Sequence, residues 1–203
     1  YLNNQSKWRL KSLIRLKQLW ILTGLCICSM GGYDTILTWL PNMLEIKGIP
    51  IMEASITASI LPLGFLISGP VIGTLSDRVG LRKPFIWILG ALSIVFIMLI
   101  PYTIQTPLWI SILIVGFALS GILTLILIMP TEHSEFSGFV GGAVGLISSM
   151  GNIGSFLFPV IVGFLIDTTE SLVPPLIFLA ITSGAVVILN LAVKETGRNK
   201  RLP

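Results

Sequence analysis

The stretch Gly73-Thr-Leu-Ser-Asp-Arg-Val-Gly-Leu-Arg-Lys-Pro-Phe85 lies between two long apolar segments and decides how the chain folds. Its charged residues are one acid and three bases: Asp77, Arg78, Arg82 and Lys83. Each flanking apolar segment is long enough to cross a bilayer, so the stretch predicts a tight polar turn between two membrane spans. Gly80 supplies backbone freedom within the turn, and Pro84 suits the first turn of the helix that follows.

The composition is that of a membrane protein that crosses the bilayer several times. Hydrophobic residues make up 54% of the 203 residues and charged residues 11%, whereas a soluble domain carries about 25% charged residues. The net charge of +4 does not indicate a nucleic-acid partner, because the bases gather at the ends of apolar segments, next to the lipid bilayer. Cys26 and Cys28 lie two positions apart in an apolar helix and point in different directions, so we predict neither a disulfide nor a metal pair.

Six apolar segments predict an all-α integral membrane fold with six transmembrane helices. We expect these helices at residues 18–40, 54–76, 84–101, 108–129, 138–166 and 174–193. Residues 18–193 then form one transmembrane domain, preceded by a basic cytoplasmic lead-in at residues 1–17 and followed by a cytoplasmic tail at residues 194–203. We also expect Gly31-Gly32-Tyr33-Asp34 to interrupt the first span and Pro41 to follow its end.

Small and polar residues line one face of the second span and one face of the fifth. On the second span this face holds Ser55, Ser59, Pro62, Gly69, Gly73 and Ser76, and on the fifth it holds Gly141, Gly145, Ser148, Asn152, Ser155 and Pro159. Small side chains let helix backbones approach closely in lipid, so these faces predict helix–helix contacts.

The basic residues predict which side of the membrane each loop occupies. Of 13 bases, five lie before the first span, three in the 73–85 stretch and four after the sixth span, which leaves only Lys47 on the opposite side. The positive-inside rule then places both termini, the 73–85 turn and the 130–137 loop in the cytoplasm. We therefore predict a multi-pass protein of the cell (cytoplasmic) membrane.

The 73–85 stretch resembles the signature loop of the major facilitator superfamily, which has the form G-x-L-[A/S]-D-R-x-G-R-[R/K]. The matching positions are Gly73, Leu75, Ser76, Asp77, Arg78 and Gly80. Leu81 stands where the family usually has an arginine. The resemblance implies one six-helix half of the major facilitator fold, with the substrate site near the midplane against a second half. The basic lead-in and the Lys194-Glu-Thr-Gly tail, which is similar to the end of the family's last helix, indicate the C-terminal half.

The same resemblance implies a secondary active transporter, or permease, that moves a small-molecule substrate by symport or antiport through alternating access, with a proton as a candidate coupling ion. The second six-helix half then belongs to the same polypeptide or to a second copy of this chain. A half-sized transporter that acts as a homodimer is the alternative, and crosslinking cysteines at positions 77 and 138 between copies tests it. An intramembrane enzyme is a further alternative, but the spans hold no nucleophile–base or metal cluster. We expect no enzyme activity, no cofactor and no metal site.

The resemblance further implies a cytoplasmic gating loop that latches the outward-facing state. Its residues are Gly73, Asp77, Arg78, Gly80, Arg82, Lys83, Glu132 and Glu135. In this interpretation Asp77 caps a helix of the other half, and the three bases pair with the two glutamates. Arg82 replaces the arginine that is missing at Leu81. The alternative is that these bases only flank a turn on the cytoplasmic side.

Asp34 is the one ionisable residue that we place well within a span, where such residues face a cavity or a partner. Asp34 and its neighbour Tyr33 are candidates for contacting substrate or carrying a coupling proton, and the alternative is a position in a water-filled vestibule. Asn152 and Ser148 are candidates for lining the same cavity, although their face also suits helix packing. No span holds Lys or Arg, which favours a neutral or cationic substrate. The only histidine, His133, is expected to be a solvated loop residue.

Overall fold

A computed structural model describes residues 13–197 of the chain. Within these residues the regular elements are all helices, and six spans are long and apolar enough to cross a membrane, as predicted. The elements are α2 (Lys17–Ile46), α3 (Ile51–Ala58), α4 (Ile60–Val79), α5 (Lys83–Leu99), η1 (Ile100–Tyr102), α6 (Gln105–Glu132), η2 (Ser134–Phe136), α7 (Val140–Thr169) and α8 (Val173–Ala192). Most of the predicted lead-in at residues 1–17, and residues 198–203 of the predicted tail, lie outside the described residues.

Helix α2 contradicts the predicted interruption of the first span. The helix runs without a break through Gly31, Asp34 and Pro41 to Ile46. Gly31 is buried against α7, where a Cβ atom would lie 2.8 Å from the backbone of Gly154. The prediction was wrong because glycine in a membrane helix can serve close packing instead of ending the helix, and because membrane helices tolerate proline.

The second span consists of two helices, and the fourth span is longer than predicted. Helix α3 ends at Ala58, and α4 begins after one intervening residue. Pro62 explains the joint, because it has no N–H group and its ring crowds the carbonyl four positions earlier. Helix α6 continues through Pro130 to Glu132, so the predicted 130–137 loop is shorter and Glu132 sits on the last turn of a helix.

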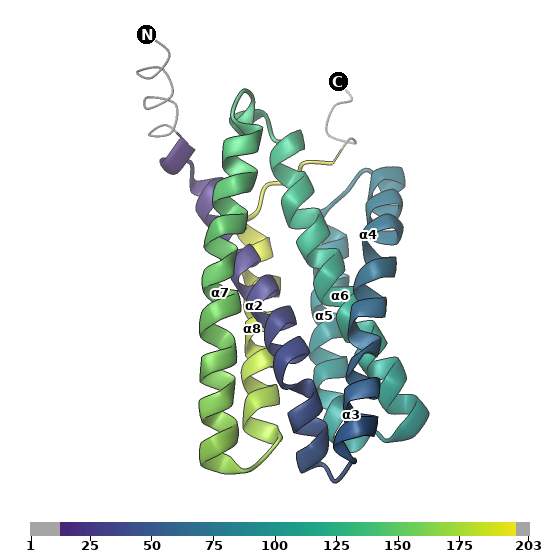
Figure 1. The fold of residues 1–203 in the computed structure, drawn as a ribbon. Coiled ribbons are helices and arrows are strands. Elements are labelled where there is room, and N and C mark those ends of the chain that lie inside the picture. Colours follow the sequence, from purple (N-terminus) through teal and green to yellow (C-terminus); the bar gives the residue numbers. More distant parts are fainter. Residues whose placement is uncertain (1–12, 198–203) are drawn as a thin grey trace.

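The helices form one bundle in which α2 packs along α7 and α4 packs along α6 (Figure 1). Helix α5 packs against both α6 and α8, and α8 also contacts α2. Glycines allow the close α4–α6 crossing, because a Cβ atom on Gly64 would lie 2.6 Å from the backbone nitrogen of Phe117. At the same crossing the hydroxyl of Ser68 donates to the Phe117 carbonyl over 2.7 Å. These contacts make the six spans one packed unit.

The small-residue face predicted on the fifth span is not the face that packs. A Cβ atom on Gly145 would meet nothing within 4 Å, and Asn152 is exposed. Helix α7 packs on α2 through Gly151 and Gly154, whose added Cβ atoms would collide with α2. The helix therefore has two small-residue faces, and the one that carries Asn152 remains open.

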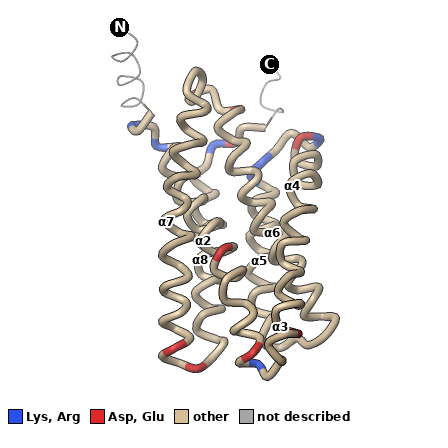
Figure 2. Tube along the Cα trace, viewed as in Figure 1, with Lys and Arg blue, Asp and Glu red and all other residues tan. Residues whose placement is uncertain are grey.

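The two ends of the bundle differ in charge (Figure 2). Nearly all described Lys and Arg residues lie at the end where the chain enters and leaves the bundle, which we call the terminal end. The opposite end, which we call the far end, carries the α2–α3 and α7–α8 connections. Lys47 lies there, and its ammonium group donates to the carbonyl of Ile100 over 2.7 Å and also to that of Thr103. Figure 1 shows that the first and last described segments both lie at the terminal end.

Candidate functional site

A sharp turn at the terminal end joins α4 to α5. Gly80 stops α4 by adopting a left-handed conformation with φ 72°, and its N–H bonds to the Ser76 carbonyl over 2.9 Å. Glycine adopts this conformation without the steric penalty that a side chain adds, so a glycine is favoured here. Arg82, two residues after Gly80, immediately precedes α5, which begins at Lys83 and has a proline in its first turn. The turn thereby points the Arg82 side chain back under α4 and α6.

The Arg82 guanidinium is the centre of a polar cluster that links three helices. Its side chain is 3% exposed and forms a two-pronged contact with Glu132, with N–O distances of 2.5 and 3.1 Å. It also donates to the Asp77 carboxylate and to the Ser76 hydroxyl. The hydrogen bonds that Arg82 donates to Glu132, and to a lesser extent to Asp77, raise the pKa of Arg82, although burial opposes the shift. The guanidinium therefore stays charged and holds α4, α5 and α6 together.

The tail after α8 completes this cluster. The Glu195 carboxylate accepts the backbone N–H groups of Arg82, over 2.7 Å, and of Lys83, over 3.1 Å. It thus satisfies N–H groups at the start of α5, which have no partner within their own helix. Thr196 donates to Glu132 over 3.3 Å, and Gly197 lies against the Gly80 backbone with no room for a side chain. The sequence had indicated this tail only by its resemblance, and Glu195 was missed because its partners are backbone atoms more than 100 positions away.

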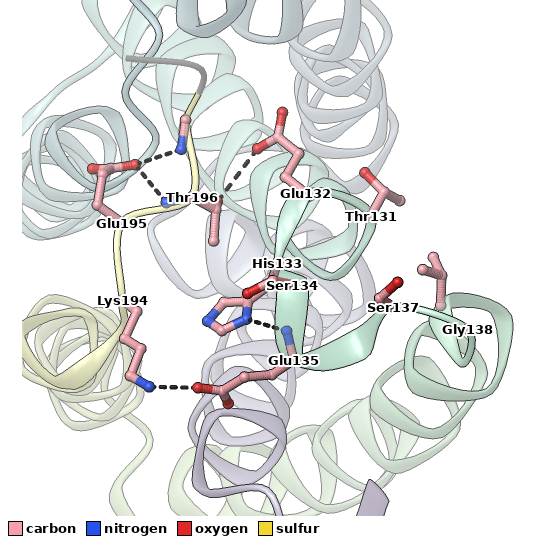
Figure 3. Close-up of a pocket in the computed structure, with 12 residues that line it drawn as sticks. Thr131, Glu132, His133, Ser134, Glu135, Ser137, Gly138, Lys194, Glu195 and Thr196 are labelled. Atoms are coloured by element: carbon pink, nitrogen blue, oxygen red, sulfur yellow. Dashed lines mark hydrogen bonds and ion pairs between the residues drawn. The ribbon is translucent and has the colours of Figure 1, made fainter. Parts of the chain in front are cut away.

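A pocket of about 620 Å³ opens beside the cluster, between the end of α6, η2 and the tail (Figure 3). Within it Lys194 forms an ion pair with Glu135 at 2.5 Å. The hydrogen bond from Lys194 lowers the pKa of Glu135. His133 accepts the Glu135 backbone N–H at its Nδ1 atom over 3.2 Å and contacts the Phe136 ring at a tilt of 57°, so it is built into the turn. This histidine was expected to be a solvated loop residue.

The structure brings together only some of the predicted gating residues. The bases Arg78, Arg82 and Lys83 were expected to pair with Glu132 and Glu135, but only the Arg82–Glu132 pair is present among the described residues. Lys83 instead donates to the Leu191 carbonyl over 3.2 Å. Gly73 has open space around it, and Arg78 is exposed. Asp77 is bonded to Arg82, yet its side chain remains 62% exposed.

The predicted substrate residues lie on α2 and α7. Tyr33 packs on Phe65 of α4 with ring centroids 5.2 Å apart. Asp34 is half-buried, and its carboxylate forms no hydrogen bond or ion pair with any described residue. On α7 the Asn152 amide donates to the Ser148 carbonyl over 3.0 Å, within the same helix. Among the described residues no hydrogen bond, ion pair or ring contact joins Tyr33 and Asp34 to Ser148 and Asn152, so the structure gives two separate groups.

Among the described residues, no group of three or more His, Cys, Asp and Glu side chains could hold a metal ion. Cys26 and Cys28 are free thiols. The polar clusters described above consist of ion pairs and hydrogen bonds that join helices.

Comparison with known proteins agrees with the fold. The family model described as Major Facilitator Superfamily matches residues 22–202. The glycine betaine/proline/ectoine/pipecolic acid transporter OusA of Dickeya dadantii is 27% identical over 92% of this chain and 38% of its own length. The human lysosomal dipeptide transporter MFSD1 is 26% identical over 89% of this chain and 39% of its length. An uncharacterized protein of Archaeoglobus fulgidus is 26% identical over 73% of this chain and 71% of its length.

The alignment with each of the two named transporters covers less than half of that protein, whereas it covers most of the Archaeoglobus protein. Six spans are also what one half of a twelve-helix transporter of this superfamily contains. The family match extends over nearly all of the helical bundle, and relatives with known roles are named as transporters, not enzymes. The chain therefore belongs to the major facilitator superfamily, and its six helices fit one half of that transporter fold.

Proposed function

We propose that the chain is one half, the C-terminal one, of a secondary active transporter that moves a small solute by alternating access. Relatives are named for transport of betaines and proline, of nitrate and nitrite, and of dipeptides, so the family supports transport of small molecules. In such proteins two six-helix units rock against each other around a site near the midplane. The packed bundle described above is suited to move as one such unit.

The Arg82 cluster is the observation that supports this proposal most strongly. Arg82 fixes the α4–α5 turn to α6 and, through Glu195, to the tail. The turn is thereby rigid, while the exposed parts of Asp77 and Arg78 project from it. A rigid turn with exposed charges suits a contact that forms with the second half in one transport state and breaks in the other. Asp77 then has one oxygen for Arg82 and one for the partner's helix end.

The charge distribution supports an orientation with the terminal end in the cytoplasm of the cell membrane. The described bases gather at that end, whereas the far end has one, Lys47. Cysteine labelling tests this orientation in intact cells, in a background in which Cys26 and Cys28 are replaced by alanine. A membrane-impermeant maleimide applied outside should react at Glu53→Cys and not at Arg78→Cys, and the reverse pattern would refute the orientation.

Flux measurements test the transport proposal. The purified chain is reconstituted in liposomes at increasing protein density, and counterflow of labelled betaine, nitrate and a dipeptide is measured beside the fraction of crosslinked pairs. A half-transporter moves solute only when it pairs with a second six-helix unit, so flux should rise with the paired fraction. Flux from chains that are demonstrably monomeric would contradict the proposal.

A homodimer of this chain is the second candidate, and the Archaeoglobus relative favours it, because most of that protein is matched by this single six-helix chain. In the dimer the exposed Asp77 of one copy faces the start of α7 in the other. Crosslinking Asp77→Cys to Ser137→Cys between differently tagged copies tests this arrangement. Ser137 replaces the neighbouring Gly138 in the experiment, because Gly138 has φ 83°, where a side chain is strained. Only intramolecular products would rule the dimer out.

A further inference from the structure

Asp34 is chemically isolated within the bundle. It is residue 18 of the 30 in α2, and every other Asp, Glu, Lys or Arg in the described spans lies within three residues of a helix end. A carboxylate at membrane depth is expensive unless it meets a partner, a cavity or a ligand. Because no described residue bonds to the Asp34 carboxylate, the bundle itself does not supply the partner.

Tyr33 is the chain neighbour of Asp34, and its ring contacts Phe65 of α4. Tyr33 and Asp34 are adjacent on α2, so their side chains leave the helix about 100° apart. The Phe65 ring of α4 has its centroid 5.2 Å from that of Tyr33, with a tilt of 51° between the rings. Phe65 is 44% exposed although it lies at the middle of the membrane span Ile51–Val79. Ring faces attract cations that come within about 6 Å of the centroid.

The far end of the bundle favours the approach of cations. Its described charged residues are the acids Glu45, Glu53, Asp167 and Glu170 and the base Lys47. The Lys47 ammonium group already donates hydrogen bonds to two backbone carbonyls, those of Ile100 and Thr103. A rim with an excess of acids raises the local concentration of positively charged solutes. The nearest charged group deeper in the bundle is the Asp34 carboxylate.

We propose that the Asp34 carboxylate and the rings of Tyr33 and Phe65 bind the ammonium group of a small organic cation. An inorganic divalent ion would need several oxygen ligands, and the described residues offer no such group. An anion would meet Asp34 with no Lys or Arg of this chain at that depth. This inference names the substrate class of the proposed transporter and so rests on that function, but binding can be measured without transport.

Equilibrium binding to the full chain in lipid nanodiscs tests the proposal. Choline is compared with 3,3-dimethylbutan-1-ol, a neutral molecule of nearly the same shape. Choline should bind at least about tenfold more tightly, because only the charged ligand gains from the carboxylate and the ring faces. Equal binding of the two ligands, or no choline binding by the unmodified chain, overturns the proposal.

Matched variants locate the site. Asp34→Asn should weaken choline binding about tenfold or more, whereas Asp167→Asn, which removes an acid at the far end, should change it less than about threefold. Phe65→Leu should weaken it about 3- to 10-fold, whereas Phe164→Leu on α7 should leave it unchanged. Choline binding that survives Asp34→Asn overturns the assignment. If choline binds but no solute is transported, the proposed function fails and the binding site stands. If anions are transported and choline does not bind, the binding site fails and the proposed function stands.

Discussion

Replacing Arg82 tests which carboxylate holds the α4–α5 turn. Arg82→Met removes the guanidinium but keeps an unbranched side chain of similar length. It breaks a two-pronged contact with Glu132 and a single contact with Asp77, and it leaves the Glu132 carboxylate without its cation. The sequence-based interpretation had Asp77 cap a helix of the other half and the bases pair with Glu132 and Glu135, whereas the structure bonds Arg82 to both Glu132 and Asp77.

The two carboxylates that Arg82 contacts differ in burial, and this difference sets the expected changes in the free energy of unfolding. Breaking a fully buried ion pair by removing one partner costs about 3–5 kcal/mol. Glu132 is 23% exposed and can be partly rehydrated, so we expect Arg82→Met to lower the free energy of unfolding by about 2–3 kcal/mol. Asp77 is 62% exposed, so Asp77→Asn should cost only about 0–1 kcal/mol. Glu132→Gln should fall between the two.

Reversible unfolding of the purified chain by SDS in mixed micelles, followed by circular dichroism, measures these differences. The matched control is Arg78→Met, the same substitution at an exposed arginine in the same turn, which should change stability by less than about 0.5 kcal/mol. A double-mutant cycle should give an Arg82–Glu132 coupling of at least about 1 kcal/mol and a smaller Arg82–Asp77 coupling. The reasoning is refuted if Asp77→Asn costs as much as Glu132→Gln, or if Arg82→Met behaves like Arg78→Met.

Three further predictions use the same unfolding measurement. Gly154→Ala should destabilise the chain by about 1–3 kcal/mol, because the new Cβ atom collides with the α2 backbone. Gly145→Ala on the same helix has open space and should stabilise the chain by about 0.5–1 kcal/mol. Equal effects of the two substitutions would contradict the α2–α7 crossing. Glu195→Gln should cost about 1 kcal/mol, because an amide is a weaker acceptor for the N–H groups at the start of α5, and a neutral effect would show that the tail does not cap this helix. The ion pair with Lys194 lowers the pKa of Glu135, so its stabilisation of roughly 0.5 kcal/mol is fully present above pH 4.5, the ordinary pKa, and is lost as the pH falls below that value. Lys194→Met should remove this part of the acid dependence of stability, and an unchanged pH profile would contradict the pair.

Much of the fold was predictable from the sequence because membrane insertion obeys one-dimensional rules. Apolar length predicts the spans, and all six are confirmed. The errors lie where the sequence pattern has two physical meanings. The glycine pair before Asp34 can end a helix or allow a neighbour to approach, and only the position of Gly154 shows which applies. Likewise, α7 carries small residues on two faces, and the sequence does not show which face meets α2.

The charged residues of the α4–α5 turn and of the end of α6 were predictable from the sequence, but Glu195 and most of the contacts were not. The charges of the 73–85 stretch pointed to the turn, but Arg82 could have paired with either loop glutamate. The contacts of Glu195 with the Arg82 and Lys83 backbone could not be read from the sequence, because backbone N–H groups carry no sequence signal.

The sequence by itself determined that this chain crosses the membrane six times and that a charged, glycine-containing turn joins the second and third spans. Those properties depend on the hydrophobicity of neighbouring residues and on local backbone preference. Only the tertiary structure decided that Arg82 is buried on Glu132, that Glu195 of the tail after α8 caps α5, and that no described residue bonds to the Asp34 carboxylate. The physical reason is that hydrogen bonds and ion pairs act over a few ångströms, and helix packing decides which distant residues come that close.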